Sequence, residues 1–175
     1  MKRPDPATLA RRLLAGDRWA ALAGARLVEV REGYARARMR LRPAHMNGVH
    51  VAQGGVVFTL ADFAFAAASN SHGTVAVALD TSITFARAAT HGVLTAEAFE
   101  DSVSRRVSVC TVRVTGEDGA VIALFRGTAF RKEEPIAPGA AGRAARPAGA
   151  ARVPPPPIKA RRTRATATGS RARRR

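Results

Sequence analysis

The sequence predicts an α+β protein with a mostly antiparallel sheet and one long buried helix. The apolar, alanine-rich stretch from Val56 to Ser69 is typical of a buried helix. Two β-like segments precede this stretch and four follow it, an order that favours the α+β class. With 175 residues, 46% of them hydrophobic, the chain is long enough to bury a core.

The elements are expected in the following order. Residues 7–23 have helical spacing and predict one or two short helices, and residues 26–31 predict a short strand. Residues 34–42 alternate strictly, with Tyr34 and four arginines on one face and apolar residues on the other. A loop leads from there into the helix. The later strands are expected at 74–86, 93–100, 105–114 and 121–130, with Glu117-Asp118-Gly119 as a hairpin turn between the last two.

The formal net charge of +16 is unevenly distributed. Eleven of the 29 Lys and Arg residues lie in residues 135–175, which contain no Asp or Glu, so the rest of the chain has a net charge of only +5. This tail is dominated by Ala, Gly, Pro and Arg, which bury too little apolar surface to offset the entropy of ordering. We therefore expect a helical segment at 1–24, a folded domain at 25–132 and a disordered basic tail at 133–175.

Composition excludes several kinds of protein. The only cysteine, Cys110, excludes a disulfide scaffold and a cysteine-rich metal site, and it is consistent with a reducing compartment. No apolar run reaches the length of a membrane span, and the N-terminus is too polar for a signal peptide. We expect a cytoplasmic protein that needs no metal or cofactor.

Asp62 is the only Asp, Glu, Lys or Arg between Pro43 and Leu79. It lies within the apolar helix, too far from its start near Gly55 to cap the helix. An unpaired carboxylate is costly to bury, so such residues persist when they are paired, hydrogen-bonded or functional. We therefore take Asp62 as the first candidate for a catalytic residue.

Other candidates lie around the start of the same helix. Gly54 and Gly55 expose backbone N–H groups that can polarise a carbonyl oxygen. Thr59 is small and shares a helical face with Asp62, which leaves room beside the carboxyl group. Two amides in the preceding loop, Asn47 and Gln53, could orient a water molecule or a carbonyl group. This combination predicts a hydrolytic site.

The same stretch resembles the hotdog-fold acyl-CoA thioesterases, most closely the PaaI proteins of phenylacetate degradation. The resemblance covers roughly residues 25–131. It is carried by Asn47-Gly48-x4-Gln53-Gly54-Gly55-x2-Phe58-x-Leu60-Ala61-Asp62-x-Ala64-Phe65-Ala66, by Asn70-Ser71 at the end of the helix and by the strand Ala123-Leu124-Phe125-Arg126-Gly127-Thr128.

The resemblance implies a hotdog fold, in which an antiparallel sheet wraps around the central helix. It also implies that Asp62 acts as general base or nucleophile, that Asn47 positions the carbonyl group or water, and that the Gly55 N–H polarises the thioester oxygen. The implied substrates are aryl- or medium-length acyl-CoA thioesters, among them phenylacetyl-CoA or its ring-hydroxylated derivatives. In this family the site lies at a dimer interface, and dimers often pair into tetramers.

Acyl-CoA carries phosphate groups, so basic residues are expected at the rim of the site. The candidates are Arg87, Arg105 and Arg106. One departure from the family pattern concerns Gln53, which stands where the family most often has histidine. An amide can replace the hydrogen bonds of that histidine but cannot titrate. His50, three residues before Gln53, is a candidate to replace that histidine, although we expect it to face solvent in the loop.

Two alternative functions stay open. The basic tail suggests a nucleic-acid-associated protein or non-specific binding of polyanions, although the chain has no aromatic stacking platform. A hotdog hydratase or dehydratase is the other alternative, since one fold supports several reactions. Those enzymes more often have a His–Asp or His–Glu pair, which Gln53 argues against. His45, His50 and His72 lack the spacing of a metal site.

Overall fold

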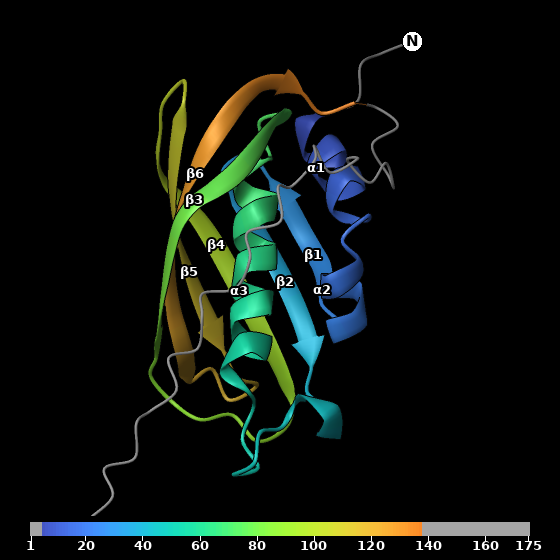
Figure 1. Cartoon of the computed structure of the whole chain (residues 1–175), viewed down its shortest axis with the longest axis vertical. Helices are drawn as coiled ribbons and strands as arrows, with labels where there is room; N and C mark the ends of the chain where they lie inside the picture. Colours follow the sequence, from blue (N-terminus) through green and yellow to red (C-terminus); the bar gives the residue numbers. More distant parts are fainter. Residues whose placement is uncertain (1–4, 138–175) are drawn as a thin grey trace, which may run out of the picture. The chain divides into compact units, whose positions relative to one another are not determined.

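A computed structural model describes residues 5–137 of the chain as three α-helices and a six-stranded sheet (Figure 1). The helices are α1 (Pro6–Leu14), α2 (Arg18–Ala23) and α3 (Gly54–Ser69), with a turn of 3-10 helix at Pro43–His45. The strands are β1 (Arg26–Arg31), β2 (Tyr34–Arg40), β3 (Thr74–Phe85), β4 (Val93–Val103), β5 (Val107–Thr115) and β6 (Val121–Pro135). Residues 133–135, which were expected in the disordered tail, instead form the end of β6. The prediction for residues 138–175 lies outside the described part of the chain.

The six strands form one sheet in the order β1-β2-β4-β5-β6-β3, and every neighbouring pair is antiparallel. β1 and β3 are therefore the two edges of the sheet. The sheet curves around α3, which packs against β2, β4, β5 and β6 (Figure 1). The predicted α+β architecture, with an antiparallel sheet around one long helix, is confirmed.

The helix α3 is buried on nearly every side because its residues are apolar nearly all round. Its Phe65 ring lies 5.7 Å from the ring of Phe125 on β6, measured between centroids. At Gly127 of β6, a Cβ atom would lie 2.8 Å from the Phe65 ring. The absence of a side chain at Gly127 therefore lets the helix approach the sheet closely.

Two strands are longer than the sequence predicts. β4 was expected to end at Glu100 but continues past an irregularity in register to Val103, paired with β5. β6 was expected to end at Phe130 but continues to Pro135, paired with the start of β3. Both extensions consist largely of exposed polar residues, held by backbone pairing, so they carry little of the apolar alternation that predicts a strand.

The N-terminal segment folds against the rest of the described chain. α1 packs against β1 and α3, and α2 packs against α3. Asp17 caps the start of α2, since its Oδ1 accepts a hydrogen bond from the N–H of Ala20 (2.9 Å). Gly24 ends the helix with a φ of 80°, a conformation that glycine adopts without strain. This segment brings Asp17 and Trp19 beside the central helix.

Candidate active site

The first turn of α3 presents two backbone donors that have no acceptor within residues 5–137. Gln53 precedes the helix and caps it, because its Oε1 accepts a hydrogen bond from the N–H of Val56 (3.2 Å). The N–H groups of Gly54 and Gly55 stay unpaired in this turn. They lie at the positive end of the helix dipole, where they can stabilise negative charge on a carbonyl oxygen.

The local packing favours glycine at both positions. A Cβ atom at Gly55 would lie 2.7 Å from Oε1 of Gln53, so a side chain there would displace the cap. A Cβ atom at Gly54 would lie 3.1 Å from the ring of Phe85. The two glycines therefore let the capped turn form and leave their N–H groups uncovered.

Asp62 lies about two helical turns beyond Gly55, on the same face of α3. It is half-buried, and its neighbours Ala61 and Phe63 are buried. Within residues 5–137, its carboxyl group accepts no hydrogen bond and forms no ion pair. Neither of the usual structural reasons for a partly buried carboxylate, a hydrogen bond or an opposite charge, therefore applies to Asp62 in the described chain.

The surroundings of Asp62 make it a stronger base than an ordinary aspartate. Burial raises the pKa of the Asp62 carboxyl group, and the negative charge of Asp17 on the N-terminal segment raises it further. A carboxylate with a raised pKa binds a proton more readily and so suits the role of general base. Sequence reasoning did not find Asp17, because its place beside Asp62 depends on how α2 packs against α3.

Thr59 connects the first turn of α3 to the N-terminal segment. Its Oγ1 donates a hydrogen bond to the carbonyl oxygen of Gly55 (2.8 Å) and accepts one from Nε1 of Trp19 (2.9 Å). The structure therefore brings Thr59, Gly55 and Asp62 to one face of α3 and adds Trp19 beside them. Nothing in the local sequence pattern indicated the contact with Trp19, which is 40 residues away in the chain.

Asn47 lies in the loop before α3 and shapes that loop. Its Oδ1 accepts hydrogen bonds from the N–H groups of Val49 (3.0 Å) and Val51 (3.2 Å), while its backbone N–H donates to the carbonyl oxygen of Val51 (2.8 Å). No acceptor for the Nδ2 amide is found in the described part of the chain. The side-chain NH₂ group of Asn47 is therefore the group that is available for a ligand.

Arg87 lies near the start of α3, whereas the other two candidate arginines do not. A groove of about 330 Å³ is lined by Gly54, Phe85 and Arg87, among others. The guanidinium group of Arg87 pairs with Asp118 at 3.2 Å, and both side chains are exposed. This ion pair is open to solvent, so a phosphate group could replace the carboxylate partner.

Arg105 and Arg106 lie in the turn between β4 and β5, at the end of the sheet where α3 ends. The backbone carbonyl of Arg106 accepts a hydrogen bond from Arg131, whose neighbour in the register is Ala76 of β3. Both arginines pair with Glu133, at 3.1 Å and 3.3 Å. Within one chain they are therefore not brought together with Gly55.

The three histidines near the motif lie apart from one another. His45 is buried against Arg42, and burial lowers its pKa, with a further effect from that arginine. His50 is exposed, and Nε2 of His72 lies 2.5 Å from Oε2 of Glu100 beyond the C-terminal end of α3. Residues 5–137 contain no group of three or more side chains placed to hold a metal ion.

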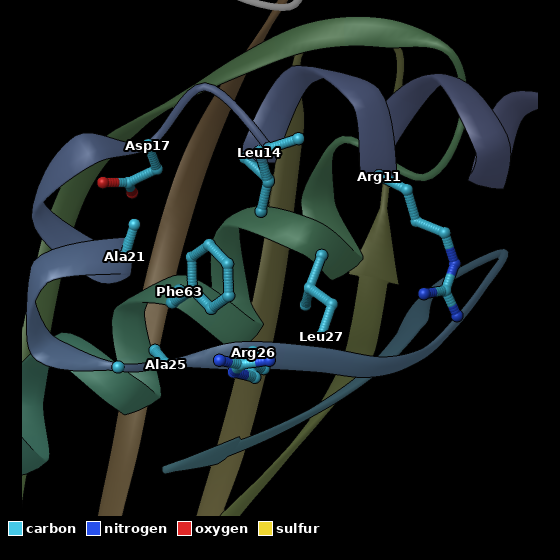
Figure 2. Close-up of a pocket in the computed structure, with 10 residues that line it drawn as sticks. Arg11, Leu14, Asp17, Ala21, Ala25, Arg26, Leu27 and Phe63 are labelled. Atoms are coloured by element: carbon cyan, nitrogen blue, oxygen red, sulfur yellow. The ribbon is translucent and has the colours of Figure 1, made fainter.

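A second cavity, of about 400 Å³, lies where α1, α2 and β1 meet α3 (Figure 2). Leu14, Leu27 and Phe63 form its apolar part, and Asp17 lies at its edge. None of the site residues predicted from the sequence lines this cavity.

Across residues 5–137, no helix has both the length and the apolar character needed to cross a membrane.

Comparison with known proteins identifies the family. Residues 50–123 match the model of the Thioesterase superfamily. A protein of Archaeoglobus fulgidus named "Putative esterase" is 41% identical over 123 residues, which cover 70% of this chain and 80% of that protein. Acyl-coenzyme A thioesterase PaaI of Escherichia coli K12 is 34% identical over 116 residues, which cover 66% of this chain and 83% of that protein.

Solved structures agree with these matches. The structure of the E. coli PaaI protein from the phenylacetic acid degradation operon superposes with a TM-score of 0.67 and 29% identity, covering 74% of this chain and 99% of that one. A mutant of the phenylacetic acid degradation protein PaaI of Thermus thermophilus superposes with a TM-score of 0.62 and 35% identity, covering 65% of this chain and 98% of that one. The chain, with its sheet curved around α3, belongs to the thioesterase superfamily and has the hotdog fold of that family.

Proposed function

We propose that this chain hydrolyses acyl-CoA thioesters at the face of α3 that carries Gly55 and Asp62. The observation that carries the proposal concerns the first three turns of α3. There, the half-buried carboxyl group of Asp62 and the N–H groups of Gly54 and Gly55 have no partner within residues 5–137. Hydrolysis of a thioester needs both a base and a donor for the carbonyl oxygen. The relative named acyl-coenzyme A thioesterase supports the choice of substrate.

In this mechanism the thioester carbonyl oxygen accepts a hydrogen bond from the N–H of Gly55. Asp62 of the same chain lies about two turns, roughly 10 Å, along α3 from Gly55. In the self-associated form proposed below, Asp62 of a second copy of the chain therefore removes a proton from water, and the water oxygen bonds to the carbonyl carbon. The tetrahedral intermediate then collapses, the carbon–sulfur bond breaks, and the CoA thiolate leaves and takes up the proton. Alternatively, the Asp62 carboxylate attacks the carbonyl carbon itself. The carbon–sulfur bond then breaks with loss of the CoA thiolate, and water hydrolyses the resulting anhydride.

Asn47 and Gln53 provide the remaining polar groups. The Oδ1 of Asn47 and the Oε1 of Gln53 already accept backbone hydrogen bonds, so each side chain offers its NH₂ group to a ligand. Donors of this kind can orient the thioester carbonyl group or the attacking water. Because Gln53 does not titrate, the proton transfer in this proposal rests on Asp62 alone.

The proposed substrates carry an aryl or medium-length acyl group, such as phenylacetyl-CoA and its ring-hydroxylated derivatives. Arg87 lies along the groove that begins at Gly54 and is the best-placed cation for a phosphate group of CoA. Arg105 and Arg106 could serve the same purpose only for a site on another copy of the chain. We propose a cytoplasmic location, because a chain with a single cysteine, Cys110, is consistent with a reducing compartment.

We further propose that the chain self-associates to a dimer or tetramer through β3. This strand is 12 residues long, lies at an edge of the sheet and exposes Val77, Leu79 and Phe85. A long edge strand with exposed apolar side chains favours pairing with another chain. Pairing at this edge would supply a second wall for the space beside Asp62.

The assay that tests the proposed function measures release of free CoA from acetyl-, hexanoyl-, octanoyl-, phenylacetyl- and ring-hydroxylated phenylacetyl-CoA by the full chain. We expect kcat/KM for the larger acyl groups to exceed that for acetyl-CoA by about tenfold or more, because an apolar pocket rewards added apolar surface. A folded chain that releases no CoA from any of these thioesters would rule out the proposed function.

A further inference from the structure

Trp19 is exposed in an unusual way for the largest apolar side chain of the molecule. Its side chain on α2 is 64% exposed, and Leu22, one turn along the same helix, is 68% exposed. An exposed tryptophan loses the benefit of burying its ring. The ring of Trp19 is nevertheless fixed, because its Nε1 donates a hydrogen bond to Oγ1 of Thr59 (2.9 Å).

The helix that carries Trp19 is held at both ends. Asp17 caps its start, and Gly24 ends it in the left-handed conformation. Nη2 of Arg42 donates a hydrogen bond to the carbonyl oxygen of Leu22 (2.8 Å), which ties the last turn to the loop after β2. The backbone that carries Trp19 is therefore fixed in advance, and the hydrogen bond to Thr59 anchors the indole N–H.

The ring lies next to the groups that are proposed to act on the thioester. Its partner Thr59 is hydrogen-bonded to the carbonyl oxygen of Gly55 and shares a face of α3 with Asp62. Asp17, two residues before Trp19, is close enough to influence the charge state of Asp62. The exposed indole ring therefore borders the face of α3 that carries Gly55, Thr59 and Asp62, which is the face on which the thioester is proposed to bind.

We propose that Trp19 forms one wall of the acyl pocket and selects for aryl acyl groups by stacking against their rings. This inference rests on the proposed function and narrows its substrate class. A flat, pre-oriented aromatic wall favours a flat aromatic ring over a flexible alkyl chain, because offset stacking adds to simple burial. Trp19 lies outside residues 50–123, which match the family model, so that match assigns it no role.

Binding can be followed directly, because Trp19 is the only tryptophan in the chain. The full chain is titrated with phenacyl-CoA, a thioether without a hydrolysable bond, and with hexyl-CoA and free CoA. We expect a saturable change in tryptophan emission with phenacyl-CoA, a smaller change with hexyl-CoA and almost none with CoA. Calorimetric binding of phenacyl-CoA that leaves the emission unchanged would place the acyl group elsewhere and overturn the inference.

Kinetics provide a second test. We expect Trp19→Ala to lower kcat/KM for phenylacetyl-CoA about fivefold to tenfold and that for hexanoyl-CoA less than twofold, and Trp19→Phe to retain most of the selectivity. Phe99→Ala is the matched control, since Phe99 is also exposed but lies on the sheet rather than on α2 or α3. It should change neither value.

Other outcomes separate this inference from the proposed function. If Trp19→Ala lowers both kcat/KM values equally and also shifts sedimentation to a smaller species, the ring serves contact between copies and the inference is wrong. If it changes neither value, the inference is also wrong, while the proposed function stands. If the unaltered chain hydrolyses no thioester and binds no phenacyl-CoA, the proposed function itself is wrong, and the inference falls with it.

Discussion

At the scale of single residues, the environment of Asp62 sets the pH at which the proposed base works. Burial, and to a lesser extent the charge of Asp17, raises the pKa of the carboxyl group above its ordinary value. Only the ionised form can accept a proton or attack a carbonyl carbon. Activity should therefore be high above the raised pKa and should be lost as the pH falls through it.

Replacing Asp17 by Asn tests this relation between the two carboxyl groups. The change removes the neighbouring negative charge, so we expect the pKa of Asp62 to fall and the acidic limb of kcat/KM to move to lower pH. Asn is as good an N-cap as Asp, so α2 should keep its start. The measurement is kcat/KM for phenylacetyl-CoA between about pH 4 and pH 8.

The matched control for this experiment is Asp101→Asn. Asp101 is exposed on β4, where its carboxyl group accepts a hydrogen bond from Thr111, and it has no influence on Asp62. Its replacement should leave the acidic limb where it is. An acidic limb that is the same in Asp17→Asn, Asp101→Asn and the unaltered chain would show that Asp17 does not act on the group that titrates.

At the scale of elements, the sequence predicted those that show a strong local pattern. The helix α3 was predicted from its apolar, alanine-rich stretch, and β1 and β2 from their position and alternation. The ends of β4 and β6 were missed, because their last residues are polar and are held only by pairing with β5 and β3. A local pattern does not report backbone pairing between distant segments.

The residues of the candidate site also differ in whether a local sequence pattern predicts their positions. Asp62, Gly55 and Thr59 lie on one helix, so their spacing alone predicts a common face, and the structure brings them together. The contributions of Asp17 and Trp19 depend on how α2 packs against α3, and no spacing within either helix contains that information. The catalytic roles of these residues remain predictions.

The edge strand β3 supports a prediction about assembly. Leu79 is 62% exposed on β3, so we expect Leu79→Lys to lower the sedimentation coefficient by separating the proposed dimer. Thioester hydrolysis should fall with it, since pairing is proposed to complete the space beside Asp62. Val28→Lys on β1, the opposite edge of the sheet, is the matched control and should change neither property. Equal sedimentation of all three chains would contradict pairing through β3.

At the scale of the whole molecule, the basic excess and the candidate site lie in different parts of the sequence. The basic excess of +16 lies mostly in residues 135–175, whereas the candidate site depends on one acidic side chain in an apolar helix. The match to the thioesterase family falls on residues 50–123, which include Asp62 and both glycines. Binding of polyanions by the tail remains a prediction, independent of the proposed hydrolysis.

Ionisation of Asp62 lowers the free energy of unfolding, and this determines how its replacement affects stability. Because the folded pKa of Asp62 is raised, stability falls as the pH rises from the ordinary range of an aspartate through the raised pKa, and the full loss persists above it. Asp62→Asn removes the charge. Its melting temperature at pH 7 should therefore be at least equal to that of the unaltered chain, and a loss of activity cannot then be ascribed to unfolding.

The most direct measurement is kcat/KM for phenylacetyl-CoA in the unaltered chain, Asp62→Asn and Asp101→Asn, each checked for its melting temperature. We expect Asp62→Asn to lower kcat/KM by about 100-fold or more, as removal of a general base or nucleophile does. Asp101→Asn should keep the full rate. Full thioester turnover by a folded Asp62→Asn chain would contradict the assignment of hydrolysis to this face of α3.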